Sequence, residues 1–202
     1  MSTTQAAGVG PLKFSDKHYE ALGRLVVAFQ YLEQVVTQAI VLLVEPAAHK
    51  KKFLFLPGIL NEMSFGTRLR VLSNIVTTTD VSYFVAAGTK YELSRREEHL
   101  EIVAELLEGI ALAGKAEEDR NRLIHSQWMG SGVLYGPAES VLRVKSRMKA
   151  DKTQRQEEYV KASDILAIVD EMDAAARIIG IKAWLLERNL IFNIPEDAPD
   201  LT

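Results

Sequence analysis

The chain has 202 residues, of which 48% are hydrophobic and 25% charged, a composition typical of a globular protein with one core. It contains no cysteine, which excludes disulfide bridges and thiolate metal sites and is compatible with the reducing cytoplasm, where we expect the protein to be. The net charge of −3 argues against a protein that wraps nucleic acid non-specifically, but not against a local basic patch.

Both ends of the chain are predicted to be loose. Residues 1–14 are small and polar, which predicts a flexible arm, and residues 192–202 predict a flexible tail. The first residues have neither the apolar core nor the basic start of a signal peptide. The longest apolar runs, such as AIVLLV at 39–44, are too short to span a bilayer, so we expect no membrane association. Residues 15–191 are predicted to form a single domain.

Four helices are predicted from apolar residues that recur at steps of three and four. The first begins at a cap formed by Ser15 or Asp16 and ends before Pro46. The second begins near Ser64, the third runs from about 94 to 127, and the fourth follows a cap at Ser163. Between the first two helices, FLFL at 53–56 is compatible with a strand or with a buried plug.

The sequence changes its period between the third and fourth helices. Glycines and a proline bracket GVLYG and SVLRVKSRMK, which predicts a β-hairpin at about 131–150. The predicted fold class is therefore all-α, an antiparallel four-helix-type bundle with a β-hairpin between the third and fourth long helices.

The stretch EEDRNRLIHSQW at 117–128 holds the residues best suited to chemistry. Sequence signatures of phosphate loops, dinucleotide folds and metalloproteases are missing, and no histidines pair at helical spacing, so we expect no cofactor and no metal. On a helix, Arg120 and His125 lie about 140° apart in azimuth and about 7.5 Å apart along the axis, so they can flank one broad groove. Asn121 precedes His125 by four residues and can fix its tautomer through a hydrogen bond.

Two interpretations of this stretch are open. Arg120 can bind phosphate oxygens with its planar guanidinium, and His125 can transfer a proton near neutral pH, which together suit attack on a phosphodiester. Alternatively, Arg120 forms a surface ion pair with Glu117, and His125 occupies a helix end where the helix dipole favours its charge.

The stretch RNRLIH at 120–125 resembles the Arg-x4-6-His motif of the HEPN superfamily, all-helical proteins named for higher-eukaryote and prokaryote nucleotide binding. In that family the residue after the arginine is often Asn, as Asn121 is here. The order of AFQYLEQVV (28–36), SFGTRLRVL (64–72) and RNRLIHSQW (120–128) is similar to that of bacterial HEPN-like proteins, over roughly two thirds of the chain.

The resemblance implies a metal-independent endoribonuclease, with Arg120 and His125 at the interface of a homodimer. Other members of the family are inactive and bind RNA, a nucleotide or a protein partner such as an antitoxin. Such a binding module is the alternative function that the resemblance leaves open for this chain.

Glu33 is a further candidate for the catalytic site. It flanks the apolar stripe of the first helix, and a carboxylate near a core face needs a partner, for which Arg120 is the first choice. Alternatively, Glu33 points outward at the rim. Asp119 and Arg68 are weaker candidates for orienting the site, because a solvated helix face explains them better.

The predicted hairpin carries a second signal, four cations at alternate positions: Arg143, Lys145, Arg147 and Lys149. Because alternate side chains of a strand point to opposite faces, these cations can line one face while the apolar residues between them pack on the bundle. Such a strip could bind an RNA backbone. Alternatively, it is an edge strand that charge protects from aggregation.

Overall fold

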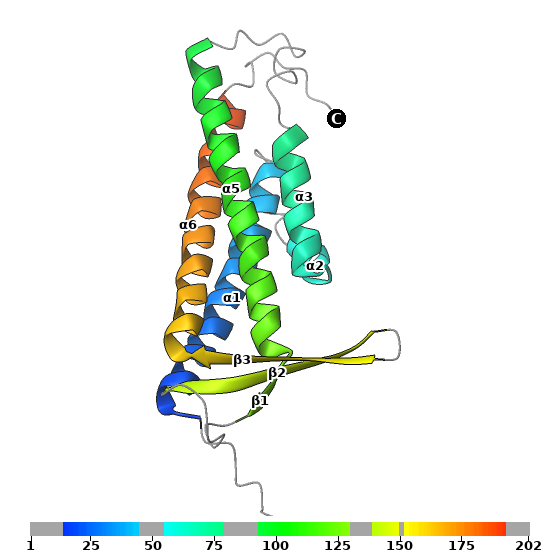
Figure 1. Ribbon diagram of the computed structural model, residues 1–202. Helices are drawn as coiled ribbons and strands as arrows, with labels where there is room; N and C mark the ends of the chain where they lie inside the picture. Colours follow the sequence, from blue (N-terminus) through cyan, green and yellow to red (C-terminus); the bar gives the residue numbers. More distant parts are fainter. Residues whose placement is uncertain (1–13, 45–54, 79–92, 130–138, 150–151, 193–202) are drawn as a thin grey trace, which may run out of the picture.

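The computed structural model describes residues 14–44, 55–78, 93–129, 139–149 and 152–192 (Figure 1). This part of the chain forms five helices and a three-stranded sheet. The helices are α1 (Asp16–Val44), α2 (Phe55–Asn61), α3 (Phe65–Thr78), α5 (Leu93–Ile124) and α6 (Ala162–Phe192), and the strands are β1 (Gln127–Met129), β2 (Ser140–Lys149) and β3 (Lys152–Lys161). The predicted all-helical class with a hairpin is confirmed.

Helices α1, α3, α5 and α6 pack around one core, with α2 beside α1 and α3 (Figure 1). The apolar stripe predicted for the last helix is buried as expected, apart from the partly exposed Val169: Ile165, Ile168, Met172, Ala176, Ile179, Ala183 and Leu186 lie in this core. The core therefore follows from the helical period of the sequence.

The helices are not all antiparallel. Gly66 lies beside Glu117 and Leu69 beside Gly114, so α5 runs antiparallel to α3, and Figure 1 shows α5 antiparallel to α6 as well. In contrast, α1 runs parallel to α3 and to α6 (Figure 1). The expected antiparallel packing thus holds for the pairs that α5 makes with α3 and α6.

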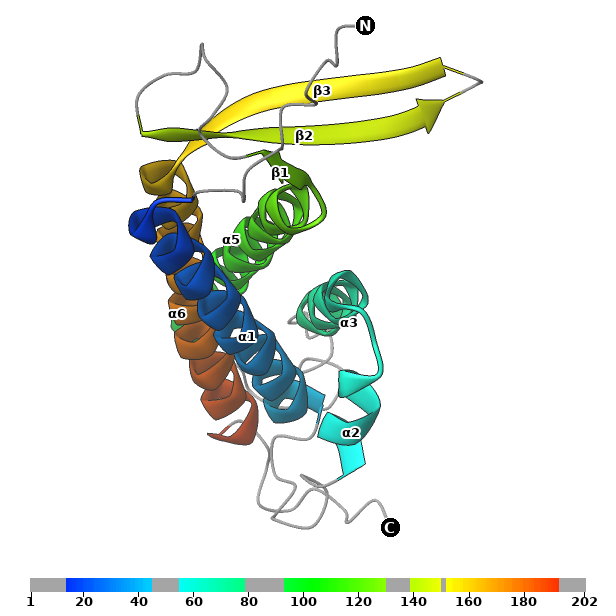
Figure 2. The same ribbon diagram turned by 90° about the horizontal axis from the view of Figure 1, so that it is seen from below.

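The hairpin lies further along the chain than predicted. Strand β2 pairs with β3, from Ser140 opposite Lys161 to Lys149 opposite Lys152, and β1 pairs with the other edge of β2. The expected bounds of about 131–150 were wrong at the second end, because the polar sequence KTQRQEEYVK gives no apolar alternation by which to recognise β3. GVLYG lies outside the described residues. The sheet crosses the end of the bundle, and its outer half extends beyond the helices (Figure 2).

The helix ends correspond closely to the predicted ones. The Ser64 hydroxyl accepts a hydrogen bond from the Thr67 backbone N–H, as a cap of α3 should. Helix α6 begins slightly before the predicted cap, where the Asp164 carboxylate accepts a bond from the Lys161 N–H. Helix α5 ends at Ile124, since Gln127 already belongs to β1. Phe55 and Leu56 begin α2 and so are helical, which excludes the predicted strand at these two residues.

Helix α1 is long and apolar enough to cross a membrane, judged by length and composition, and it is the one such helix among the described residues. More than half of its most apolar window is buried in the bundle, and core helices of soluble proteins have the same property. Residues 1–13 of the predicted arm and 193–202 of the predicted tail lie outside the described residues. Phe14, at the inner end of the arm, packs its ring against Trp128.

Candidate functional site

The last turns of α5 lie between the start of α3 and the sheet. Glu117, about two turns before the end of α5, lies against Gly66, the second residue of α3. Arg122, in the last turn of α5, forms a 2.9 Å ion pair with Glu158 of β3. Arg120 of the candidate motif therefore lies on α5 between these two contacts.

Arg120 packs against an aromatic ring of the first helix. Its guanidinium carbon lies 4.5 Å from the centre of the Phe29 ring, which meets Phe65 of α3 edge-on at 5.1 Å. Such a cation–π contact holds the guanidinium in place while leaving its N–H groups able to bind. This contact could not be predicted from the sequence, in which Phe29 is one of the apolar residues that recur along the first helix.

The Asn121 side chain forms its hydrogen bond with Arg120 rather than with His125. Its side-chain oxygen accepts a 2.9 Å hydrogen bond from the guanidinium, and in the described part of the chain it makes no bond to the imidazole. The predicted bond from Asn121 to His125 was therefore wrong in this structure. The neighbouring guanidinium is a charged donor, and hydrogen bonds from charged donors are stronger than those between neutral groups.

His125 is the first residue after α5 and is exposed. Its backbone N–H donates to the Asn121 carbonyl at 3.2 Å, which continues the helical hydrogen-bonding pattern by one residue. Among the described residues, no group bonds its imidazole. The ring therefore lies at the carboxyl end of the helix, available to solvent.

The predicted partner of Glu33 was wrong. Glu33 bonds Arg68 of α3 at 2.5 Å, and the same guanidinium donates to the Thr37 hydroxyl at 3.0 Å. The Arg68 side chain is 8% exposed and that of Glu33 is 30% exposed, so Glu33 does not simply point outward. Arg68 lies closer to Glu33 than Arg120 does, because α3 runs parallel to α1 and begins beside Phe29. The Arg120 guanidinium instead covers the Phe29 ring.

Glu117 lies near this group of residues without forming the ion pair with Arg120 that the alternative interpretation expected. Partial burial raises the pKa of Glu117, and the charges of Glu33 and Glu118 act in the same direction. A hydrogen bond from the Gly66 backbone and the charge of Arg120 lower the pKa, with a smaller effect than burial. Glu117 is thus close enough to Arg120 for the guanidinium charge to affect the pKa of its carboxyl group. Asp119 bonds Arg122 at 3.2 Å instead and belongs to a different face of α5.

Arg143 does not lie on a solvent-facing strip. It is 2% exposed and forms a 2.8 Å ion pair with Glu158. Its guanidinium also donates to the Arg122 carbonyl at 2.6 Å and to the Ser126 hydroxyl at 3.2 Å. The predicted exposure of Arg143 was wrong, because its face of β2 is turned toward the end of α5, where unpaired carbonyls attract a cation.

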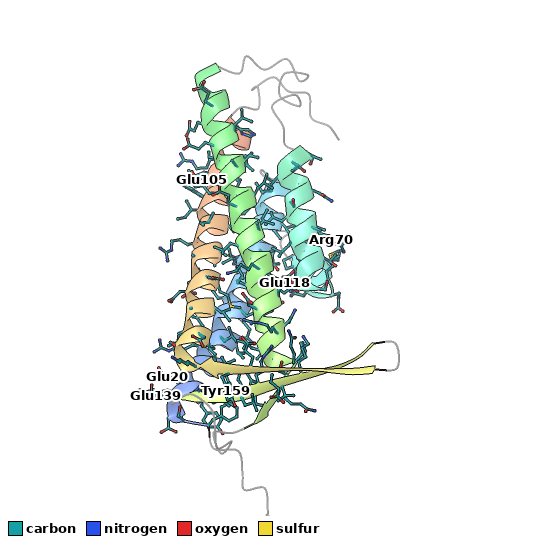
Figure 3. The ribbon with its side chains drawn as sticks, viewed as in Figure 1. Glu20, Arg70, Glu105, Glu118, Glu139 and Tyr159 are labelled. Atoms are coloured by element: carbon teal, nitrogen blue, oxygen red, sulfur yellow. The ribbon has the colours of Figure 1, made fainter. Side chains whose placement is uncertain are left out.

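The opposite face of the sheet is turned away from the helices. Tyr159, the partner of Leu142, lies on that side and is 40% exposed (Figure 3). Of the other predicted cations, Lys145 is half-buried on β2, and the side chains of Arg147 and Lys149 are outside the described part. The backbone of β2 at these two positions belongs to the outer half of the hairpin (Figure 2).

No cluster of three or more metal-binding side chains occurs within the described ranges. Comparison of the chain with protein-family models, with curated proteins and with solved structures finds no match.

Proposed function

We propose that the chain is a HEPN-like, metal-independent endoribonuclease whose chemistry is carried by Arg120 and His125. One observation supports this most. Four arginines of the described part are buried or half-buried, and three of them, Arg68, Arg122 and Arg143, bond a carboxylate. Arg120 is held by Phe29 and Asn121 and has no carboxylate partner there. Its free N–H groups suit an external anion such as a phosphodiester.

In the proposed reaction Arg120 binds the scissile phosphate and offsets the charge that builds on its oxygens in the transition state. The RNA 2′-hydroxyl attacks phosphorus and loses its proton to a histidine acting as general base. The bond to the 5′-oxygen breaks, and this oxygen takes a proton from a general acid. The products are a 2′,3′-cyclic phosphate and a 5′-hydroxyl end.

This reaction needs one base and one acid, and a single copy of the motif offers one histidine. A second copy across a two-fold axis supplies another Arg120 and another His125 around the same groove, because an isologous interface brings the same segment of both copies together. We therefore propose a homodimer for the active form. The exposed position of His125 at the end of α5 is compatible with such an arrangement.

A catalytically inactive binding module for RNA, a nucleotide or a protein partner is the second candidate. It is favoured by one observation, the imidazole of His125, which no described residue orients. General bases usually have such a partner. Binding without cleavage by the wild-type protein would support this candidate over the nuclease.

The test is incubation of the pure protein with mixed RNA in EDTA. We expect cleavage by the wild type and none by Arg120→Ala or His125→Ala, with helical content unchanged. Gln127→Ala serves as the matched control, since Gln127 is exposed close to His125. RNA that stays intact with the wild type would refute the nuclease. Activity in the His125→Ala variant would refute the assigned base.

A further inference from the structure

A second surface of the bundle lies on the side of α1 away from Arg120. Phe29, which holds Arg120, and Tyr31 are two residues apart, which is about 200° around a helix. Tyr31 therefore points away from the candidate site, toward the groove between α1 and α6. We call this surface the α1–α6 face and define it by Val27, Tyr31, Asp173, Arg177, Ile181 and Trp184.

Large apolar side chains of the α1–α6 face are exposed to an unusual degree. Val27 is 65% exposed, Tyr31 55%, Ile181 50% and Trp184 47%. Tyr31 stands between two hollows, one of about 580 Å³ beside Val27 and Asp173 and one of about 280 Å³ beside Arg177 and Ile181. A projecting ring between two hollows, with apolar residues around it, is the shape of a protein interface.

The charges on this face are complementary to each other after a two-fold rotation. Asp173 and Arg177 are exposed, one turn apart on α6, and neither forms an ion pair within the described ranges. A two-fold axis between them, perpendicular to α6, places Asp173 of each copy opposite Arg177 of the other. Two ion pairs form in this way without any change in the fold.

Tyr31 lies at the height of the same axis. Gly180 is beside Val35, and α1 and α6 run parallel. We measure positions along the helix axes from the level of Gly180 and Val35. Arg177 lies about 4.5 Å, Tyr31 about 6 Å and Asp173 about 10 Å from that level, each in the direction of the sheet. The two-fold rotation therefore brings the Tyr31 ring of one copy to the larger hollow of the other, next to its Tyr31.

From these observations we infer that the α1–α6 face binds a second copy of this chain, with α6 antiparallel to α6 of that copy. The two hollows of this face are lined by two acids, Glu20 and Asp173, and by two cations, Arg24 and Arg177. These charges cancel, so the hollows offer no net charge to nucleic acid. Four charged residues around the hollows would also be costly in a lipid environment. This contact is separate from the one proposed for Arg120.

Charge reversal tests the inference by sedimentation and light scattering on the full chain. Asp173→Arg and Arg177→Asp each place like charges opposite one another, and we expect each to raise the dissociation constant at least about tenfold. The double variant, Asp173→Arg with Arg177→Asp, restores both pairs and should restore the wild-type assembly. Arg70→Asp, an exposed position on α3, is the control and should change nothing.

Three results would overturn the inference: a wild type that is monomeric at its highest soluble concentration, single reversals that leave the assembly unchanged, or a double variant that fails to recover. If one of the charge-reversal variants does not fold, Tyr31→Glu replaces it and should weaken self-association in the same way. Arg120→Ala leaves this contact intact, so failure of the proposed nuclease and failure of this interface are distinguishable. If both contacts form, the wild type exceeds a dimer, and each single reversal reduces it to the dimer held by the Arg120 contact.

Discussion

At the scale of single residues, the ion pair between Glu33 and Arg68 joins α1 to α3. Replacement of Glu33 by Gln keeps the shape and leaves the mostly buried Arg68 without a counter-charge. We expect the free energy of unfolding to fall by about 1–3 kcal/mol. Chemical denaturation measures this change.

The matched control for Glu33 is Glu20→Gln. Glu20 pairs with Arg24, but both side chains are about 60% exposed, so its loss should change stability by less than about 0.5 kcal/mol. Equal effects of the two replacements would mean that the Glu33–Arg68 pair behaves as an ordinary surface pair.

Glu117 predicts a pH dependence of stability. Burial raises its pKa above the ordinary value of 4.5, so the folded protein holds this proton at a pH where the unfolded chain has lost it. Stability from this group is therefore complete below pH 4.5 and is lost as pH rises through the higher pKa of the folded state.

The Glu117→Gln variant removes that titration. We expect it to gain stability relative to the wild type as pH rises from 4 toward 7, which thermal unfolding across this range would show. Glu108→Gln, exposed on the same helix and not among the charges that act on Glu117, is the control. A difference between Glu117→Gln and wild type that stays constant with pH would contradict the role of burial.

At the scale of elements, Arg143 connects the sheet to the end of α5. Arg143→Met keeps much of the volume but removes the bonds to the Arg122 carbonyl, to Ser126 and to Glu158. We expect a loss of about 2–3 kcal/mol in unfolding free energy. Faster amide hydrogen exchange at 121–126 should accompany it, because the last turn of α5 loses its cap.

Lys145→Met on the same strand is the comparison, since Lys145 is only half-buried. It should change stability much less than Arg143→Met does. If the two variants are equally stable, the bonds of Arg143 contribute little, and the sheet must be held against α5 by apolar contacts.

The outer half of the hairpin predicts a salt effect. Replacement of Lys145, Arg147 and Lys149 by Ser should weaken binding of single-stranded RNA. Each lost phosphate contact should reduce the slope of log affinity against log salt by about 0.7. An unchanged slope would favour the interpretation in which charge protects an edge strand from aggregation.

The elements also show which parts of the fold could be predicted from the sequence. The period of apolar residues predicts α1, α3, α5 and α6 and most of their buried positions, because the core imposes that period. Strand β3 could not be predicted, since its sequence is polar and its pairing depends on β2. The burial of Arg143 follows from where the sheet crosses the end of α5, and alternation within one strand does not contain that information.

At the scale of the whole molecule, the residues of the candidate site come from three helices. Glu33 and Phe29 lie on α1, Arg68 on α3 and Arg120 on α5. The sequence identified Glu33 and Arg120 as members of one region, but their partners depend on the parallel packing of α1 and α3. That packing follows from the path of the chain between these helices and is not encoded in either helix alone.

The two-copy site predicts complementation. Arg120→Ala and His125→Ala are each expected to be inactive, and a mixture of the two should regain part of the cleavage activity if Arg120 and His125 of different copies act together. Size measurements on each variant show that the copies still associate. A mixture as inactive as its components would restrict the reaction to residues of one copy.

The most direct measurement uses one RNA oligonucleotide in two forms, unmodified and with every 2′-hydroxyl methylated, incubated with the wild type in EDTA. We expect cleavage of the unmodified RNA alone, with 2′,3′-cyclic phosphate ends, and no cleavage by His125→Ala. Unmodified RNA that stays intact, cleavage of the methylated RNA, or undiminished activity of His125→Ala would contradict the proposed reaction.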